Sequence, residues 1–266
     1  MALLAAGEAQ ILSGGTDFYP ALGDRVVRGP VVDVSGLGEL RGVSTDADYL
    51  RIGGLTTWSE IIRTPLPRCF DALKSAAREV GGVQIQNRGT VAGNLCNASP
   101  AADGVPPLLA LDAEVELVSN VGVRRLPLAD FIVGNRKTQM KADELLTAVL
   151  VPRALENAAS MFVKLGARRY LVISISMVAV VVKLSEGRVL EARVAVGSCS
   201  GVARRLRALE AELVGASVCD GLGGVVRPEH LDALSPIDDV RATAEYRMDA
   251  SLRLLQRALN SCVENG

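Results

Sequence analysis

The chain has 266 residues, 29 basic and 30 acidic side chains, and a net charge of −1. This length suffices for one large domain or two ordinary ones, and the 49% of hydrophobic residues predicts a well-buried core and argues against disorder. Aromatic residues make up only 3% and no dense basic patch occurs, so we expect no nucleic-acid binding.

The first half of the chain predicts short strands that alternate with helices. Strands are expected over residues 10–12, 31–34, 49–53, 114–119 and 149–152. One helix begins at Thr57, and a second covers residues 70–80 and stops at a glycine pair. The remaining predictions are a polar loop over 88–103, a helical turn over 107–110, and short helices or turns over 127–131 and 143–147.

The second half changes character after an alanine-rich stretch, residues 153–160, which we take as a domain boundary. Strands are expected over 159–165, 173–184 and 189–197, with residues 185–188 as a hairpin turn. Helices are expected over 203–214, 229–234 and 242–263. This order predicts an α+β fold with two domains, residues 1–155 and residues 156–266.

The number and spacing of the cysteines and histidines limit which metal sites and catalytic groups this chain can form. The five cysteines have no Cys-x-x-Cys spacing, so neither a zinc ribbon nor an iron–sulfur cluster is expected in this chain. Their odd, scattered count is typical of the reducing cytoplasm. With a single histidine, we expect no histidine-based metal site and no catalytic Ser-His-Asp arrangement, and we name no residue of this chain as a metal ligand. The longest apolar run, residues 171–182, is too short to span a membrane, and no signal peptide is expected.

Two segments combine small residues with polar side chains, namely residues 13–17 (Ser-Gly-Gly-Thr-Asp) and residues 88–103. Small residues let the backbone approach a ligand, and backbone N–H groups, hydroxyls and amides then donate to phosphate oxygens. Two such segments predict a clamp on a diphosphate. The alternatives are a plain turn for the first and a solvated loop for the second. Neither Gly-x-Gly-x-x-Gly nor the phosphate-binding P-loop occurs, so a nucleotide would have to be held in another way.

Together the two segments resemble the flavin-binding signature of the molybdenum hydroxylase (xanthine dehydrogenase and carbon monoxide dehydrogenase) family, in its separate FAD-binding medium subunit. The family pattern joins Gly-Gly-Thr-Asp to Arg-Asn-x-Ala-Thr-Ile-Gly-Gly-Asn and then Pro-x-x-Asp. Residues 14–17, 86–94 and 100–103 match these three parts in order. Residues 107–113, 144–147 and 162–169 also match family segments, so the resemblance covers nearly the whole chain.

The resemblance implies a two-domain FAD-binding fold, with a PCMH-type flavin domain followed by a C-terminal domain of a hairpin plus helices. The implied FAD-binding residues are Leu12, Ser13, Gly14, Gly15, Thr16, Asp17, Phe18, Thr90, Gly93, Asn94, Cys96, Asn97, Asp103, Leu146 and Lys164. Residues 13–18 would wrap the diphosphate, and residues 90–97 would form a second wall along the diphosphate and ribityl chain. Asp103 would accept a hydrogen bond from a flavin or ribose hydroxyl, and Leu146 and Lys164 would approach the adenine or the isoalloxazine. The alternative for Lys164 is a surface ion pair.

The resemblance also implies partners and a role in electron transfer. The chain would be the flavoprotein component of a heterotrimer, or of a dimer of heterotrimers, in the cytoplasm. A small subunit with [2Fe–2S] clusters would deliver electrons from a large molybdopterin subunit, and FAD would pass them to an external acceptor. NAD is not expected as that acceptor, because Tyr170 and Leu171 follow the double arginine where animal xanthine dehydrogenase has an acidic pair. Two alternatives are a self-standing FAD-dependent oxidoreductase and a flavin-free structural subunit.

Overall fold

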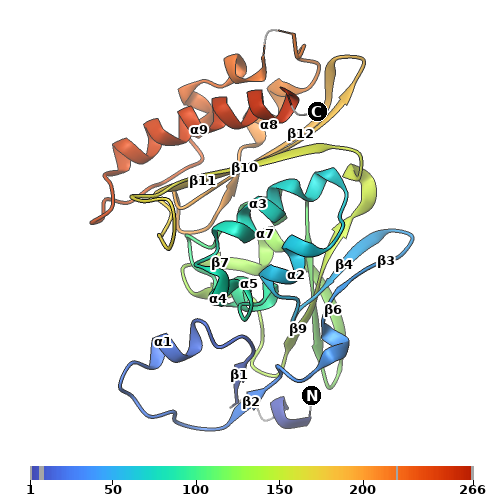
Figure 1. Cartoon of the computed structure of the whole chain (residues 1–266), viewed down its shortest axis with the longest axis vertical. Coiled ribbons are helices and arrows are strands. Elements are labelled where there is room, and N and C mark those ends of the chain that lie inside the picture. Colours follow the sequence, from blue (N-terminus) through green and yellow to red (C-terminus); the bar gives the residue numbers. More distant parts are fainter. Residues whose placement is uncertain (1, 6–8, 220, 265–266) are drawn as a thin grey trace.

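The computed structural model describes residues 2–5, 9–219 and 221–264. Two antiparallel sheets alternate with helical layers, and a small N-terminal lobe lies at one end (Figure 1). Within the described ranges, no helix is both long and apolar enough to cross a bilayer.

The first sheet has five strands. In spatial order they are β3 (Val43–Thr45), β4 (Tyr49–Gly53), β9 (Leu145–Pro152), β5 (Glu114–Ser119) and β6 (Gly122–Pro127). The helices beside it are α2 (Trp58–Arg63), α3 (Asp71–Glu79), α4 (Val83–Gln86), α5 (Val91–Asn97), α6 (Val105–Ala110) and α7 (Leu128–Phe131). A small hairpin, β7 (Ile132–Gly134) and β8 (Lys137–Thr138), follows α7.

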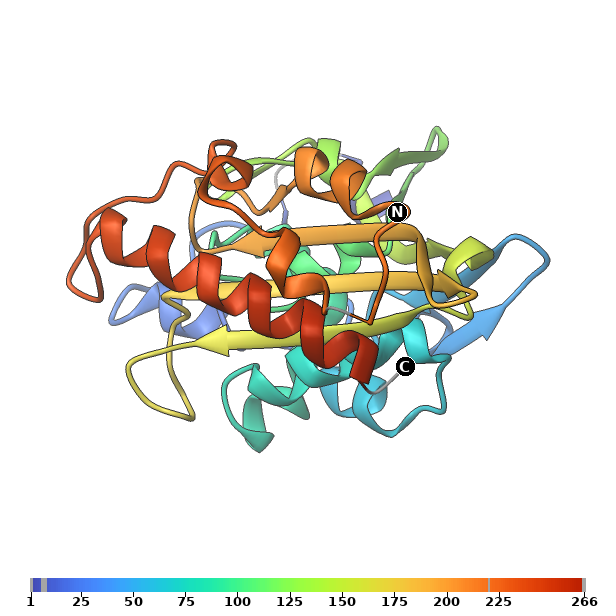
Figure 2. The same cartoon turned by 90° about the horizontal axis from the view of Figure 1, so that it is seen from above.

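The second sheet lies between two helical layers. Its strands are β10 (Ala159–Leu165), β11 (Ser176–Ser185), β12 (Arg188–Gly197) and β13 (Arg204–Arg205). Its outer face is covered by α8 (Arg207–Leu213) and α9 (Ala244–Glu264), which Figure 2 shows from above. Short 3-10 helices complete the chain: η1 (Ala2–Leu4), η2 (Gly38–Leu40), η3 (Arg68–Phe70), η4 (Arg153–Leu155), η5 (Leu222–Val225) and η6 (Pro228–Leu231).

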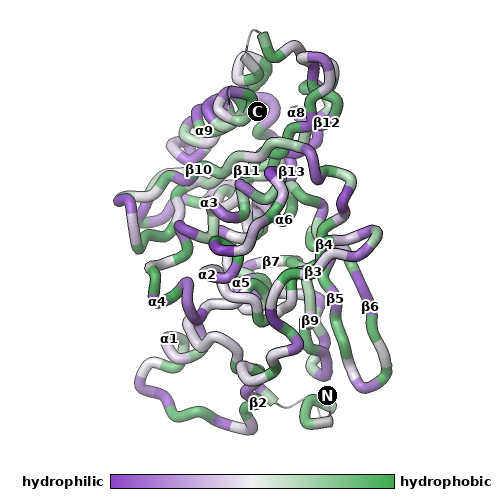
Figure 3. The backbone as a smooth tube through the Cα atoms, turned by 45° about the vertical axis from the view of Figure 1, so that its right-hand side comes forward, coloured by the Kyte–Doolittle hydropathy of each residue, from purple (hydrophilic) through white to green (hydrophobic). Residues whose placement is uncertain are grey.

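Strand β11 explains why the sequence there is apolar without alternation. Met177 and Ala179 belong to the core cluster on the inner face, whereas Val178 and Val180 belong to the cluster under α9. A strand that is buried on both faces needs apolar residues at every position. In Figure 3 hydrophobic stretches accordingly follow β9 and β11, the strands that helices cover.

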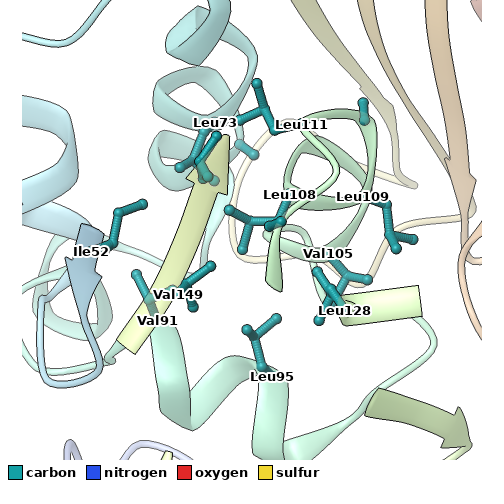
Figure 4. Packing of buried hydrophobic residues seen from close by; sticks show 14 of the residues in the cluster. Ile52, Leu73, Val91, Leu95, Val105, Leu108, Leu109, Leu111, Leu128 and Val149 are labelled. Carbon is teal, nitrogen blue, oxygen red and sulfur yellow. The ribbon is translucent and has the colours of Figure 1, made fainter. Parts of the chain in front are cut away.

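The inner core joins the two sheets. Figure 4 shows Leu73 of α3 and Leu108 of α6 packing towards Ile52 and Val149 of the first sheet. The same cluster includes Met177 of the second sheet. The chain passes from one sheet to the other through η4, and the predicted division into residues 1–155 and 156–266 stays a prediction.

The N-terminal lobe contains β1 (Gln10–Leu12), α1 (Phe18–Leu22) and β2 (Val31–Asp33), with β1 and β2 paired in parallel. It has its own small core, which is formed by Leu4, Val34, Leu55 and Leu145. Two of these four residues lie outside the lobe: Leu55 follows β4, and Leu145 is the first residue of β9. The lobe is therefore attached to the rest of the molecule by a few apolar contacts.

The predicted α+β fold class is confirmed, and several strands have the predicted bounds. Three element predictions are wrong. Segment 88–103 is not one loop, because Thr90 caps α5. Segment 143–147, predicted as a short helix or turn, is a turn only at Asp143, because β9 begins at Leu145. Segment 203–214 is not one helix, because β13 pairs with β12 before α8 begins.

Candidate functional site

A cavity of about 600 Å³ lies between the N-terminal lobe and the first sheet with its helices. This volume is in the range of about 300–1,000 Å³ that is typical of small-molecule sites. Twelve of the fifteen predicted residues line it: Ser13, Gly14, Gly15, Thr16, Asp17, Phe18, Thr90, Gly93, Asn94, Cys96, Asn97 and Leu146. Segments that are distant in the sequence thus share one cavity, although their contacts with a ligand stay predictions.

The first wall is the segment from Ser13 to Phe18, which follows β1. It crosses the main chain at Arg88 so closely that a Cβ on Gly14 would lie 2.1 Å from the Arg88 carbonyl oxygen. Gly15 has a φ of 76°, a conformation that favours glycine. Among the described residues, none accepts a hydrogen bond from the N–H groups of residues 14–17. This wall therefore offers a run of backbone donors.

The second wall is helix α5. The Thr90 hydroxyl caps it by accepting from the Gly93 N–H at 3.0 Å, and it also lies 3.3 Å from the Ser13 hydroxyl of the first wall. The N–H groups of Val91 and Ala92 donate to carbonyl oxygens of the turn between β4 and α2. Few backbone N–H groups at the start of α5 therefore remain free. Helix α5 contributes to the cavity mainly through its side chains.

Two carboxamides and a thiol project from α5. The Asn94 Oδ1 atom is buried and has no hydrogen-bond partner among the described residues. Such an orphaned acceptor is costly unless a ligand or water donates to it. The Cys96 sulfur lies 3.8 Å from the Met140 sulfur, and burial raises the pKa of its thiol to about 12. Cys96 is therefore a neutral lining group and not a nucleophile.

The third wall runs from Met140 to Leu146. Glu144 holds its shape, because its carboxylate accepts from the Arg124 guanidinium at 2.6 and 2.9 Å and from the Lys141 N–H at 2.7 Å. The bond to Arg124 holds the pKa of Glu144 below its usual value. Lys141 itself lines the cavity.

Asp103 and Lys164 lie outside the lining residues and bind each other. The Lys164 ammonium lies 2.8 Å from the Asp103 carboxylate, which also accepts from the Ser174 hydroxyl at 2.8 Å. Both side chains are buried, so the alternative of a surface ion pair for Lys164 is wrong. Burial raises the pKa of the Asp103 carboxyl, and Lys164 offsets part of that rise. The predicted contacts of these two residues, and of Leu12, with a cofactor stay predictions.

Sequence reasoning missed most of the apolar lining and one charged lining residue, Lys141. The missed residues are Ala9, Ile11, Ala21, Val34, Leu55, Trp58, Val80, Ile85, Gly89, Ala92, Met140, Lys141, Ala142 and Leu145. Trp58 is the chain's one tryptophan and is 1% exposed, and its ring lies where a Cβ on Gly104 would have to be. The one sequence signal that could have indicated this lining was the single tryptophan, which lies beside a helix cap. In the described residues no group of three or more metal-ligating side chains occurs.

Two family matches cover this chain almost end to end. Residues 1–154 match the family described as "FAD binding domain in molybdopterin dehydrogenase", and residues 161–262 match "CO dehydrogenase flavoprotein C-terminal domain".

Individual relatives agree with these matches. The xanthine dehydrogenase FAD-binding subunit of Escherichia coli O157:H7 is 31% identical over 96% of this chain and 89% of its own length. The nicotinate dehydrogenase FAD-subunit of Eubacterium barkeri is 37% identical over 72% of this chain and 66% of its own length. Among solved structures, quinoline 2-oxidoreductase from Pseudomonas putida 86 superposes with a TM-score of 0.91 at 25% identity, over 99% of this chain and 93% of that one.

Proposed function

The chain belongs to the family of FAD-binding domains in molybdopterin dehydrogenases, and on this premise we propose that it carries electrons from an iron–sulfur partner subunit to an external acceptor. It is an FAD-binding subunit of the molybdenum hydroxylase family. Electron delivery, the acceptor and the partners are the proposed part.

The observation that carries the proposal is the run of open N–H groups in residues 14–17 beside the Ser13–Thr90 hydroxyl pair. Several backbone donors that converge on one concave surface are suited to phosphate oxygens. The cradle also depends on glycine, because a Cβ on Gly14 would fill the space that Arg88 occupies. These residues fit the diphosphate of FAD.

The rest of the cavity fits the remainder of a dinucleotide. The half-buried side chains of Ile11, Phe18 and Ile85 offer an apolar surface for ring systems, with Trp58 and Leu146 packed behind it. FAD, when bound, supplies chemistry that connects one-electron donors to two-electron acceptors. The chain's own residues bind and orient the cofactor.

The lining also favours electron transfer over substrate chemistry at this site. Among the described lining residues, the only charged side chains are Asp17 and Lys141, and no histidine is present. A self-standing oxidoreductase needs a positioned acid or base near its substrate. We therefore infer that the substrate is oxidised in another subunit.

The inferred partners are a small subunit with [2Fe–2S] clusters and a large molybdopterin subunit, in a heterotrimer. The names of the relatives support an assembly, because they describe subunits or medium chains. All five cysteines of this chain are free, which is compatible with the cytoplasm that we propose.

The test is an absorption spectrum of the purified chain, with the released cofactor identified by mass. We expect a flavin spectrum and FAD at about one per chain. A colourless protein that also fails to take up added FAD would overturn the proposal. Electron transfer is tested in the native complex, where substrate should bleach the flavin only when the iron–sulfur subunit is present.

A further inference from the structure

Arg136 lies outside the cavity lining but contacts it through α5. The residue occupies the turn between β7 and β8 with a φ of 58°, and its N–H donates to the Ala98 carbonyl at 2.9 Å. Its guanidinium donates to the Asn97 side-chain oxygen and lies 3.4 Å from the Asn97 main-chain oxygen. Arg136 thus holds the C-terminal end of α5, where Ala98 turns left-handed with a φ of 47°.

This contact fixes the polarity of the Asn97 amide. A guanidinium has donors only, so the group that faces Arg136 must be the carboxamide oxygen and not its NH₂. Asn97 also lines the cavity, where its NH₂ group remains free to donate. An asparagine without such a neighbour could turn either end towards a ligand.

Asn94 has the opposite polarity one helical turn earlier. Residues three apart lie on the same side of a helix, and both side chains line the cavity. The Asn94 oxygen is an acceptor without a partner, whereas Asn97 offers a donor. The Asn94 oxygen is itself buried and lies 3.0 Å from where a Cβ on Gly104 would be, so the side-chain polarity that can be assigned on the cavity side of α5 is that of Asn97.

We propose that Arg136 is a positioning residue for the cofactor, since it locks the Asn97 amide so that its NH₂ donates to an oxygen of FAD. The inference rests on the proposed function and adds to it a residue that does not line the cavity. Its side chain acts through Asn97 alone, while its main-chain bond to Ala98 shapes the helix end in any variant.

The decisive change is Arg136→Glu. A glutamate accepts hydrogen bonds, so it would bind the Asn97 NH₂ and turn the amide oxygen towards the cofactor oxygen. We expect the FAD Kd of the cofactor-free full chain to rise about tenfold or more, and Arg136→Lys to stay within about threefold of wild type. The matched control is Lys137→Glu, an equal charge change at an exposed neighbour, which should leave the Kd within about twofold.

A double-mutant cycle separates positioning from a general effect on the helix end. In an Asn97→Ala background, Arg136→Glu should cause no further loss of FAD affinity, whereas a purely structural role would cause the same loss as before. If Arg136→Glu does not fold, Arg136→Met, which removes the donor to the Asn97 oxygen, is compared with Lys137→Met as a test of the same contact. Additive effects, or equal Kd values for Arg136→Glu and Lys137→Glu, would overturn this inference alone. A wild-type chain that binds no FAD would overturn the proposed function as well.

Discussion

Gly14→Ala adds a single methyl group to the cavity wall and should strongly weaken FAD binding. The new Cβ would lie 2.1 Å from the Arg88 carbonyl oxygen and 2.8 Å from its carbon, and ordinary contact begins near 3.4 Å. The two backbone segments would therefore have to part by about 1.3 Å. That shift breaks the contact between the Ser13 and Thr90 hydroxyls, now at 3.3 Å, and moves the open N–H groups away from the diphosphate.

The loss can be estimated from these donors. One hydrogen bond to a charged group is worth about 1.5–3 kcal/mol, which is about 10- to 150-fold in Kd. Because more than one donor moves, we expect the FAD Kd to rise at least about 100-fold in a fluorescence titration of the cofactor-free chain. Gly36→Ala is the control, since its Cβ meets nothing within 4 Å. A folded Gly14→Ala variant with the wild-type Kd would refute the reasoning.

Three further predictions concern the walls and their support. Gly93→Val places a side chain 2.9 Å from the capping hydroxyl and in the cavity, so the folded variant should purify without FAD; full retention would contradict this. Asp103→Asn leaves the buried Lys164 ammonium unpaired and should lower the unfolding free energy, measured in urea, by about 3 kcal/mol. The double variant Asp103→Leu with Lys164→Met leaves no unpaired charge and should recover most of that unfolding free energy. An equal loss in the two variants would contradict the role assigned to the ion pair. The hydrogen bond to Arg124 holds the pKa of Glu144 below its ordinary value of 4.5. Ionised Glu144 therefore stabilises the folded state above pH 4.5, and this stabilisation is lost as the pH falls through the lowered pKa. The melting temperatures of wild type and Glu144→Gln should therefore differ at neutral pH and converge in acid.

The strands were predictable because their patterns are local. Strand β5 alternates half-buried and buried residues over its first four positions, and β11 is a valine-rich strand that two helical layers cover. Helix α5 was not predicted, because its glycine, asparagines and cysteine are poor helix formers and its start depends on the Thr90 cap. Tertiary contacts stabilise it against that preference.

The polar part of the candidate site was predictable and the apolar part was not. Short polar residues beside glycines are rare enough in a segment to be noticed, as in residues 13–17. An apolar residue such as Leu55 or Ile85 gives no sign of whether it faces a core or a cavity. The Asp103–Lys164 pair joins residues 61 apart, and only the packing of β10 against the central helices brings them together.

The position of the cavity gives the cofactor a structural role as well as a chemical one. One wall belongs to the N-terminal lobe, whose own core has four buried side chains, and the other walls belong to the much larger inner core. A ligand that contacts both parts binds only their closed arrangement and stabilises it by mass action. The lobe should therefore be held mainly by bound FAD, and any substitution that weakens FAD binding at residues 14–17 should also loosen β1 and β2.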